Sequence, residues 1–299
     1  LPWADILPKN AKFPVQGRTY KSKLFSISDS QSIVKKAIVE SLRDTYKTDW
    51  FEEDGDNYQL EIEIIKDIAC ITLDTSGQGL HKRGYRDRAG DAPLKETMAS
   101  ALVQLSYWNP DRLLVDPFCG SGTIAIEAAM LGKNIAPGLD RDFDAMAWDI
   151  IGKDLFKEVR QDAMGQVKME VELNILGTDI DKWGIDRSIS NRDNLGLTDD
   201  DIRFEIKDAR SFYTRQDYGV LITNPPYGDR MGTEEEIRSL YKDFGKQVRG
   251  LDTWSFYVLT SMESFEKDFG RQADRKRKLY NGKLKVDYLY VKDKDGNEY

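Results

Sequence analysis

The stretch Leu113-Leu114-Val115-Asp116-Pro117-Phe118-Cys119-Gly120-Ser121-Gly122-Thr123 decides the fold of this 299-residue chain. An apolar strand ends in an acid, and a Gly-x-Gly turn then opens a helix. The glycines let the backbone approach a ligand closely, and the free N–H groups of the helix N-terminus favour a carboxylate. A dinucleotide site would need a third glycine where Ile124-Ala125 stands, and no phosphate-binding lysine follows. The turn therefore favours an amino-acid carboxylate over a pyrophosphate, although alone it is also typical of a tight strand-to-helix connection.

Downstream of this turn, strand and helix patterns alternate to the end of the chain. Strand patterns cover 113–115, 175–178, 203–206, 220–223 and 254–259, and helical patterns cover 123–131, 183–195, 234–248 and 262–269. Such alternation predicts an α/β fold with a mostly parallel sheet and helices on both faces. The last strand patterns, 276–280 and 284–291, flank Asn281-Gly282, which predicts an antiparallel hairpin at one edge of the sheet.

Upstream, residues 1–80 predict a small α+β domain. Ser28 followed by Gln31 is typical of a helix-capping box. The apolar residues behind it repeat on one helical face: Ile33, Val34, Ala37, Ile38 and Leu42. Residues 58–65 then alternate, and 68–73 form a second strand pattern after a two-residue turn at Lys66-Asp67.

The small, Gly-rich residues 75–79 predict the boundary between this domain and a second one over residues 81–299. A helix is expected soon after it, with Pro93 in the first turn, where a missing N–H costs nothing. Residues 133–173 are long for a single crossover, so we expect an inserted helical subdomain there.

Acidic residues follow two further strand patterns. Asp179 ends one of them, where a carboxylate can accept hydrogen bonds from ribose hydroxyls. Asp181 has either that role or the role of capping the next helix. Asp208 follows the next strand and could accept a hydrogen bond from the exocyclic amine of adenine, or it could be a solvent-facing loop acid.

Asn224-Pro225-Pro226-Tyr227 follows the buried strand pattern 221–223 and is the most specific motif of the chain. The two prolines fix the turn and remove two N–H donors, so that carbonyl oxygens are left as acceptors. Asn224 adds a side-chain oxygen, and Tyr227 adds a flat face. Together they predict a trap for a planar amine, whose nitrogen they would position for methyl transfer without a covalent intermediate. The alternative is a merely Pro-rich loop.

Composition limits the other kinds of site. Cys70, Cys119 and the only histidine, His81, form neither a disulfide framework nor a zinc spacing, so we expect two reduced, buried thiols, a cytoplasmic protein and no metal. No apolar run is long enough to span a bilayer, and no signal peptide is visible. The chain does not begin with Met, which predicts a fragment.

The net charge of −8 argues against bulk attraction to nucleic acid. However, residues 1–36 carry seven Lys or Arg and two acids, and residues 271–285 carry seven and one. Such clusters can follow phosphates or can simply solvate a surface.

In this order, the motifs resemble the Rossmann-like class I amino-methyltransferases, from about residue 84 to the C-terminus. The resemblance includes Arg86 and residues 89–97, as the element beside the methionine part of the cofactor. With residues 80–86 upstream, the segment is similar to one subfamily, the THUMP-domain RNA guanine-N2 methyltransferases of bacterial large-subunit ribosomal RNA. These are often labelled N6-adenine-specific DNA methylases. Residues 1–80 would then be an RNA-binding THUMP module, incomplete because family members usually begin with a further small domain.

The resemblance implies a pocket for S-adenosylmethionine and its product S-adenosylhomocysteine, with these cofactor-binding residues: Glu96, Thr97, Asp116, Phe118, Cys119, Gly120, Gly122, Thr123, Asp179, Asp208 and Asn224. It places Asn224, Pro225, Pro226 and Tyr227 around the target amine. We therefore expect methyl transfer to the exocyclic N2 of a guanine in 23S ribosomal RNA, with that RNA or an assembly precursor as partner and no obligate protein partner. The alternatives are adenine N6 in DNA, a glutamine amide in a protein, or an RNA-binding assembly factor with a relic pocket.

Overall fold

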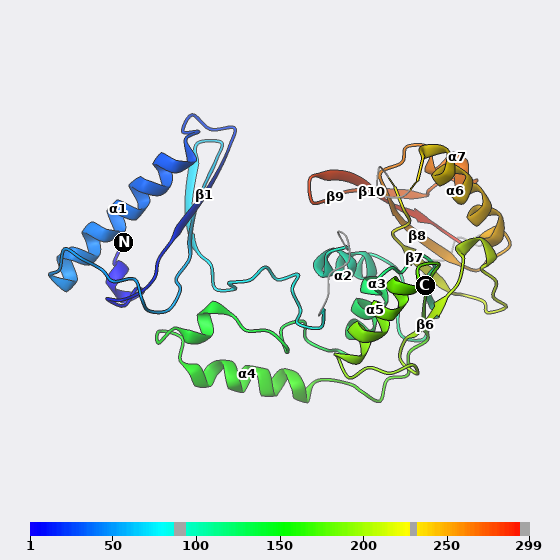
Figure 1. The fold of residues 1–299 in the computed structure, drawn as a ribbon, viewed down its shortest axis with the longest axis horizontal. Coiled ribbons are helices and arrows are strands. Elements are labelled where there is room, and N and C mark those ends of the chain that lie inside the picture. The colour runs from blue at the N-terminus through cyan, green and yellow to red at the C-terminus, as the bar shows by residue number, and fades with distance from the viewer. Residues whose placement is uncertain (87–93, 228–231, 294–299) are drawn as a thin grey trace. The chain divides into compact units, whose positions relative to one another are not determined.

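The computed structural model describes residues 1–86, 94–227 and 232–293. Contacts divide the chain into two compact units, drawn as a ribbon in Figure 1. The first unit combines residues 1–80 with 141–162, and the second combines residues 81–140 with 163–299. The division thus falls after residue 80, but a segment from the middle of the chain joins the first unit.

A three-stranded sheet with one long helix forms the first unit. Its elements are the 3-10 helix η1 (Trp3–Asp5), β1 (Val15–Tyr20), α1 (Ile27–Tyr46), β2 (Leu60–Ile65) and β3 (Ile68–Leu73). β1 runs parallel to β2, and β2 runs antiparallel to β3. Lys66 and Asp67 have φ values of 51° and 66° and make the tight turn, so the predicted hairpin is confirmed. Leu60, Ile62 and Ile64 share the buried face, as their alternation predicts.

The start of α1 differs from the prediction. Ser26, not Ser28, is the N-cap, and its hydroxyl accepts a hydrogen bond from Asp29 N. Gln31 donates instead to the carbonyl of Val15 on the neighbouring strand. Ile38 and Leu42 are buried, whereas Ile33 is 68% exposed. The buried face of α1 is therefore narrower than the apolar pattern predicts.

Residues 141–162 pack into the core of the first unit. Trp148 stacks on Tyr58 with ring centroids 4.6 Å apart, and its Nε1 donates to the carbonyl of Asn57 over 2.9 Å. The Arg141 guanidinium donates to the carbonyls of Ser76 and Gly79. The segment contains the 3-10 helix η2 (Asp144–Ala147) and the start of α4 (Lys153–Gly165). It does not form the separate subdomain expected for residues 133–173, because its aromatic side chain completes another core.

A seven-stranded sheet forms the second unit, in the order β6-β5-β4-β7-β8-β10-β9. The strands are β4 (Leu114–Asp116), β5 (Ile175–Asp179), β6 (Arg203–Ile206), β7 (Val220–Thr223), β8 (Ser255–Thr260), β9 (Arg275–Asn281) and β10 (Leu284–Val291). β4 to β8 are parallel, and β10 pairs antiparallel with β8 and β9. The mostly parallel sheet with a terminal hairpin is thus as predicted.

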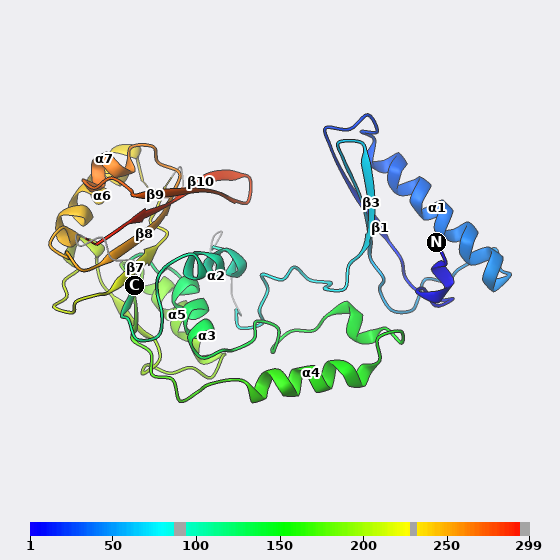
Figure 2. The same ribbon diagram turned by 180° about the vertical axis from the view of Figure 1, so that it is seen from behind.

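Helices cover both faces of this sheet. One core contains buried residues of α2 (Glu96–Gln104), α3 (Thr123–Gly132) and α5 (Lys182–Asp193), with alternate strand residues such as Leu114 and Ile222. The other contains residues of α6 (Glu234–Val248) and α7 (Phe265–Phe269), with Val115 and Leu221. The arrangement is also visible from behind in Figure 2. Within the residues that the structure describes, no helix is long and apolar enough to cross a membrane. Pro93, predicted in the first turn of α2, lies outside the described residues.

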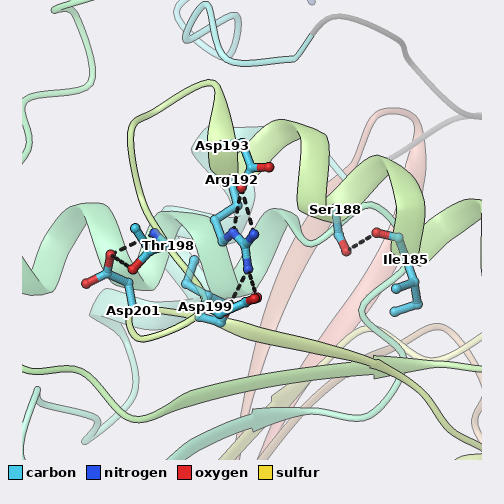
Figure 3. Close-up of polar contacts among 8 residues, drawn as sticks. Ile185, Ser188, Arg192, Asp193, Thr198, Asp199 and Asp201 are labelled. Carbon is cyan, nitrogen blue, oxygen red and sulfur yellow. Dashed lines mark hydrogen bonds and ion pairs between the residues drawn. The ribbon is translucent and has the colours of Figure 1, made fainter.

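Arg192 fixes the connection from α5 to β6, as Figure 3 shows. Its buried guanidinium pairs with Asp193 and Asp199 and donates to the carbonyl of Ile202, which precedes β6. Thr198 N donates to Asp201 over 2.8 Å in the same loop. These contacts therefore anchor the chain at the start of β6.

Candidate functional site

The parallel strands β4, β5, β6 and β7 end at the same edge of the sheet, and the chain order reverses between β4 and β7. This is the switch point at which open α/β sheets bind ligands. A cavity of about 730 Å³ opens there, within the size range of small-molecule sites. Of the predicted residues, these line it: Asp116, Phe118, Cys119, Gly120, Thr123, Asp179, Asp208, Asn224, Pro225, Pro226 and Tyr227. Three residues that were also predicted to bind the cofactor do not line the cavity: Glu96, Thr97 and Gly122.

The two glycines of the turn serve different purposes. Gly120 has φ of 53°, and a Cβ there would meet no atom within 4 Å among the described residues, so it borders open cavity space. Gly122 is the N-cap of α3 with φ of 78°, and a Cβ there would stand 2.8 Å from Ser188 Cβ. Gly120 therefore keeps the ligand space open, whereas Gly122 permits α3 to pack against α5.

Asp116 joins β4 to β7 at the switch point. One carboxylate oxygen, Oδ1, accepts hydrogen bonds from Thr223 Oγ1 over 2.6 Å and from Phe118 N over 3.2 Å. Burial raises the pKa of this carboxyl from 3.8 to about 7, although those two hydrogen bonds lower it. Burial also raises the pKa of the neighbouring Cys119 thiol well above its usual value, so this cysteine remains a neutral thiol. Cys70, on the outer strand β3, is exposed, so the expectation of two buried thiols is wrong for this residue.

Asp179 ties β5 to the glycine turn. Its Oδ2 accepts from Gly120 N over 2.8 Å, and its Oδ1 accepts from Asp181 N over 3.0 Å. A carboxylate has about four acceptor positions, so others remain for ligand hydroxyls. Asp181 accepts from the backbone N–H groups of Trp183 and Gly184. Asp181 therefore caps α5, and because it also lines the cavity, the ribose role considered for it stays a prediction.

Asp208 forms an ion pair with Arg210, a residue that the sequence analysis did not single out. Arg210 donates from Nη2 to Asp208 Oδ2 over 2.5 Å, and its backbone N–H donates to Oδ1 over 2.8 Å. The Arg210 guanidinium lowers the pKa of this carboxyl. Arg210, Arg187 and Ile180 also line the cavity. Each lies within two residues of a predicted acid or in the helix that follows it, but nothing in the residue pattern singles them out.

The side-chain oxygen of Asn224 is a hydrogen-bond acceptor to which no described residue donates. Its Oδ1 is buried and has no hydrogen-bond partner in the part of the chain that the structure describes. Pro226 and Tyr227, by contrast, have hydrogen-bond partners. Tyr241 donates its hydroxyl to the carbonyl of Pro226 over 2.5 Å. Tyr227 is buried, and its hydroxyl accepts from Asn281 Nδ2 over 3.2 Å. A buried carbonyl oxygen without a partner is costly, which indicates that a ligand supplies the donor.

The segment before α2 supports the cavity from outside. Arg86 donates to Thr123 Oγ1 over 2.7 Å and pairs with the buried Glu96 over 3.3 Å. Glu96 and Thr97, predicted to bind the cofactor, belong to α2 rather than to the cavity wall, and the nearest wall residue is Leu94. Of the residues that carry the family resemblance, 89–93 lie outside the described residues.

Comparison with known families and proteins identifies the chain. A family model for the RMKL-like methyltransferase domain matches residues 83–289, and a model for the THUMP domain matches residues 1–74. The chain belongs to the RMKL-like methyltransferase family.

Three relatives of this family member are informative. It is 50% identical over 288 residues to a Bacillus subtilis (strain 168) protein described as "Putative RNA methyltransferase YpsC", covering 96% of this chain and 74% of that protein. A Listeria monocytogenes structure described as a predicted N6-adenine-specific DNA methylase has 46% identity and a TM-score of 0.91, covering 98% of this chain and 76% of that one. A structure described as "SMU.472, a putative methyltransferase complexed with SAH" (S-adenosylhomocysteine) has 42% identity and a TM-score of 0.90, covering 97% of this chain and 77% of that one.

The family and the cavity agree on the reaction class, so the protein is an S-adenosylmethionine-dependent methyltransferase with an N-terminal THUMP domain. The cavity has the size, the open glycine turn and the strand-end carboxylates that such a cofactor requires. Among the described residues, no group of three or more His, Cys, Asp or Glu is arranged to hold a metal ion.

Proposed function

We propose that this protein methylates the exocyclic N2 amine of a guanine in 23S ribosomal RNA. The cofactor would supply an electrophilic methyl group. The buried Oδ1 of Asn224, which lacks a donor among the described residues, carries the proposal, because an exocyclic amine has the N–H groups that this oxygen needs. The proposed substrate would place the protein in the cytoplasm.

Each residue of the motif has a proposed task at the target base. Asn224 Oδ1 and the Pro225 carbonyl would accept from the two amine hydrogens and direct the nitrogen lone pair toward the methyl group. The nitrogen would use that lone pair to form the new C–N bond as the bond between that methyl group and the sulfonium sulfur breaks, which leaves S-adenosylhomocysteine, and one N–H proton would then pass to solvent. Tyr227 would contact the base plane, and its hydroxyl contact with Asn281 would fix its ring.

The remaining wall residues have proposed tasks toward the cofactor. Asp179 would accept from ribose hydroxyls with the oxygen positions that Gly120 and Asp181 leave free. Asp208 would accept from the adenine amine, although Arg210 already engages both of its oxygens. The guanidinium would therefore have to share that carboxylate or move aside.

The choice of RNA rests on residues 1–74. This segment matches the THUMP domain, and the Bacillus subtilis relative is described as an RNA methyltransferase. The basic residues among positions 1–36 would contact phosphates. The guanine would have to be unpaired or flipped out of its stack to reach a cavity at the end of β7.

A side-by-side methyl-transfer assay tests the proposal. The full chain is given labelled S-adenosylmethionine with undermodified ribosomal RNA, genomic DNA or a release-factor protein, and the products are digested and identified by mass. Label in N2-methylguanosine supports both reaction and substrate. Label in N6-methyladenine of DNA, as the description of the Listeria relative would suggest, or label in protein would refute the substrate assignment. Cofactor binding without transfer to any of the three would favour a relic pocket.

A further inference from the structure

The β9–β10 hairpin carries a concentration of positive charge that the proposed function leaves unused. Residues 275–285 contain six Lys or Arg and no acid, in a chain with a net charge of −8. β10 pairs with β8 only from Asp287 to Val291, and Lys278 and Arg277 of β9 pair with Asp287 and Tyr288, so residues 279–286 form a two-stranded ribbon without a third strand. Residues 277–286, which include this ribbon, are here named the hairpin tip. Figures 1 and 2 both show this end of the hairpin extending past β8.

The charges at the base of the hairpin are already engaged. Lys276 pairs with Glu266, and Arg275 donates to the hydroxyl of Tyr107. In the tip, by contrast, the exposed Arg277, Lys278, Lys283 and Lys285 have no acidic partner among the described residues. Their charges therefore remain available to an external anion.

The tip also exposes an aromatic ring. Tyr280 is 57% exposed, and the Lys278 ammonium lies 5.7 Å from its ring centroid. Lysines on an edge strand can serve simply to prevent edge-to-edge pairing of sheets. An exposed tyrosine does not serve that purpose. A flat ring among cations is instead the combination with which proteins bind single-stranded nucleic acid.

The tip begins beside the proposed amine trap. Asn281, at the end of β9, donates from Nδ2 to the hydroxyl of Tyr227, and Tyr227 lines the cavity. Tyr280 is the next residue along the chain. One hydrogen bond therefore links the ribbon to the motif that would hold the target base, so a strand entering the cavity would pass close to the tip.

We propose that the hairpin tip binds the substrate RNA strand next to the methylated base. Arg277, Lys278, Lys283 and Lys285 contact its phosphates, and Tyr280 stacks on a neighbouring base. This inference rests on the proposed function, since it takes RNA as the substrate. An acidic protein would satisfy the charges, but it would give no role to an exposed ring placed one residue from the contact with Tyr227.

Salt-dependent RNA binding tests the phosphate contacts. The full chain is compared with a tip variant carrying Arg277→Gln, Lys278→Gln, Lys283→Gln and Lys285→Gln, using undermodified 23S ribosomal RNA. Each lost phosphate contact lowers the slope of log affinity against log salt by about 0.7 on single strands, so the slope should fall by up to about 3. At 0.1 M salt, affinity should fall at least about tenfold.

A matched variant controls for the loss of net charge. Arg203→Gln, Lys242→Gln, Lys246→Gln and Lys267→Gln remove four exposed cations from β6, α6 and α7, on other parts of the same unit. This variant should lose little affinity and keep the parent's salt slope. Both variants should keep the thermal midpoint and the S-adenosylmethionine affinity of the parent. Equal RNA affinity and slope for parent and tip variant would overturn the proposal, as would equal losses in the two variants.

Tyr280 gives an independent test that leaves the charges intact. Tyr280→Ala should weaken RNA binding by about 5- to 100-fold, and Tyr280→Phe should restore it, because stacking needs the ring and not the hydroxyl. Equal affinities for the alanine and phenylalanine variants would remove the stacking role.

Measuring RNA affinity and methyl transfer together distinguishes failure of this inference from failure of the proposed function. If the parent produces no N2-methylguanosine but the tip variant still loses RNA affinity, the proposed function fails and the hairpin remains an RNA contact. If the parent methylates RNA and the tip variant binds and reacts as well as the parent, only the hairpin inference fails. If the tip variant keeps the RNA affinity of the parent but loses methylation of a protein, the tip binds an acidic protein, and the hairpin inference is overturned in that case too.

Discussion

Replacing Asn224 by alanine should separate catalysis from stability. In the free protein, the buried Oδ1 has no donor among the described residues, and a buried acceptor left unpaired costs about 1–3 kcal/mol. Asn224→Ala removes that acceptor, and the methyl group it leaves borders an open cavity. The variant should therefore be as stable as the parent or more so. A gain of about 1 kcal/mol corresponds to roughly 2–4 °C in the thermal midpoint of a unit of this size.

The same change should be severe for the chemical step. Removing one preorganised polar group that acts on the reacting centre lowers kcat by about 10²–10³, or about 2.7–4 kcal/mol. Cofactor affinity should change little, because Asn224 is assigned to the target amine. Single-turnover methyl transfer with saturating cofactor and RNA gives the rate, and calorimetry gives the affinity.

Asn194→Ala is the matched control. Asn194 Nδ2 donates to the carbonyl of Tyr85 over 2.8 Å, and Asn194 does not line the cavity. This variant should lose about 1 kcal/mol of stability and keep kcat within a fewfold. The reasoning is refuted if Asn224→Ala keeps kcat within a factor of ten. A parallel loss of cofactor affinity and rate would also refute it, because Asn224 would then belong to the cofactor.

Three further substitutions test other parts of the structure. Asp179→Ala should weaken S-adenosylmethionine binding at least about tenfold by calorimetry, since it removes an acceptor for ribose and the partner of Gly120 N; unchanged affinity would end the ribose assignment. Burial raises the pKa of the Asp116 carboxyl from 3.8 to about 7, so between these pH values the folded state holds a proton that the unfolded state has lost. The free energy of unfolding should therefore fall as pH rises from about 4 to 7. Asp116→Asn should abolish that fall, on the order of 4 kcal/mol at most, in urea unfolding at several pH values; parallel pH profiles for parent and variant would contradict it. Trp148→Ala should destabilise the first unit by about 3–5 kcal/mol in urea unfolding, with partial recovery in Trp148→Phe, and a loss below about 1 kcal/mol would show that residues 141–162 do not complete that core.

The second unit could be predicted largely from the sequence because its signals are local. Strands 203–206, 220–223 and 284–291 and helix 234–248 begin and end where the residue pattern predicts. Thr233 makes a capping box with Glu236, and Gly282 makes the hairpin turn, so the elements carry their own boundaries. The convergence of the four motifs then follows from parallel pairing alone, because parallel strands bring their carboxyl ends to one edge.

The first unit was harder because its decisive contacts are distant in sequence. β1 contains Gly17 and only a weak alternation, and it becomes a strand by pairing in parallel with β2, more than forty residues away. Trp148 gave no local sign that its ring would stack on Tyr58. At α1, Ser26 and Ser28 are both chemically able to cap, and the choice between them depends on where the preceding chain enters. Hydrophobic periodicity predicts whether a segment is a helix or a strand, but it does not show which distant segment will pack against it.

The acidic residues of the cavity differ from Asn224 in how fully their side-chain oxygens are hydrogen-bonded within the protein. Asp116 and Asp179 each accept backbone or hydroxyl hydrogen bonds that hold the glycine turn to β7 and β5, so much of their acceptor capacity stabilises the fold. Asn224 Oδ1 has no such bond among the described residues, although this oxygen is buried. A desolvated acceptor that contributes nothing to the fold is explained by a donor that arrives with the substrate. The sequence shows that an asparagine stands at this strand end, but only the packing around it shows that its oxygen is left unsatisfied.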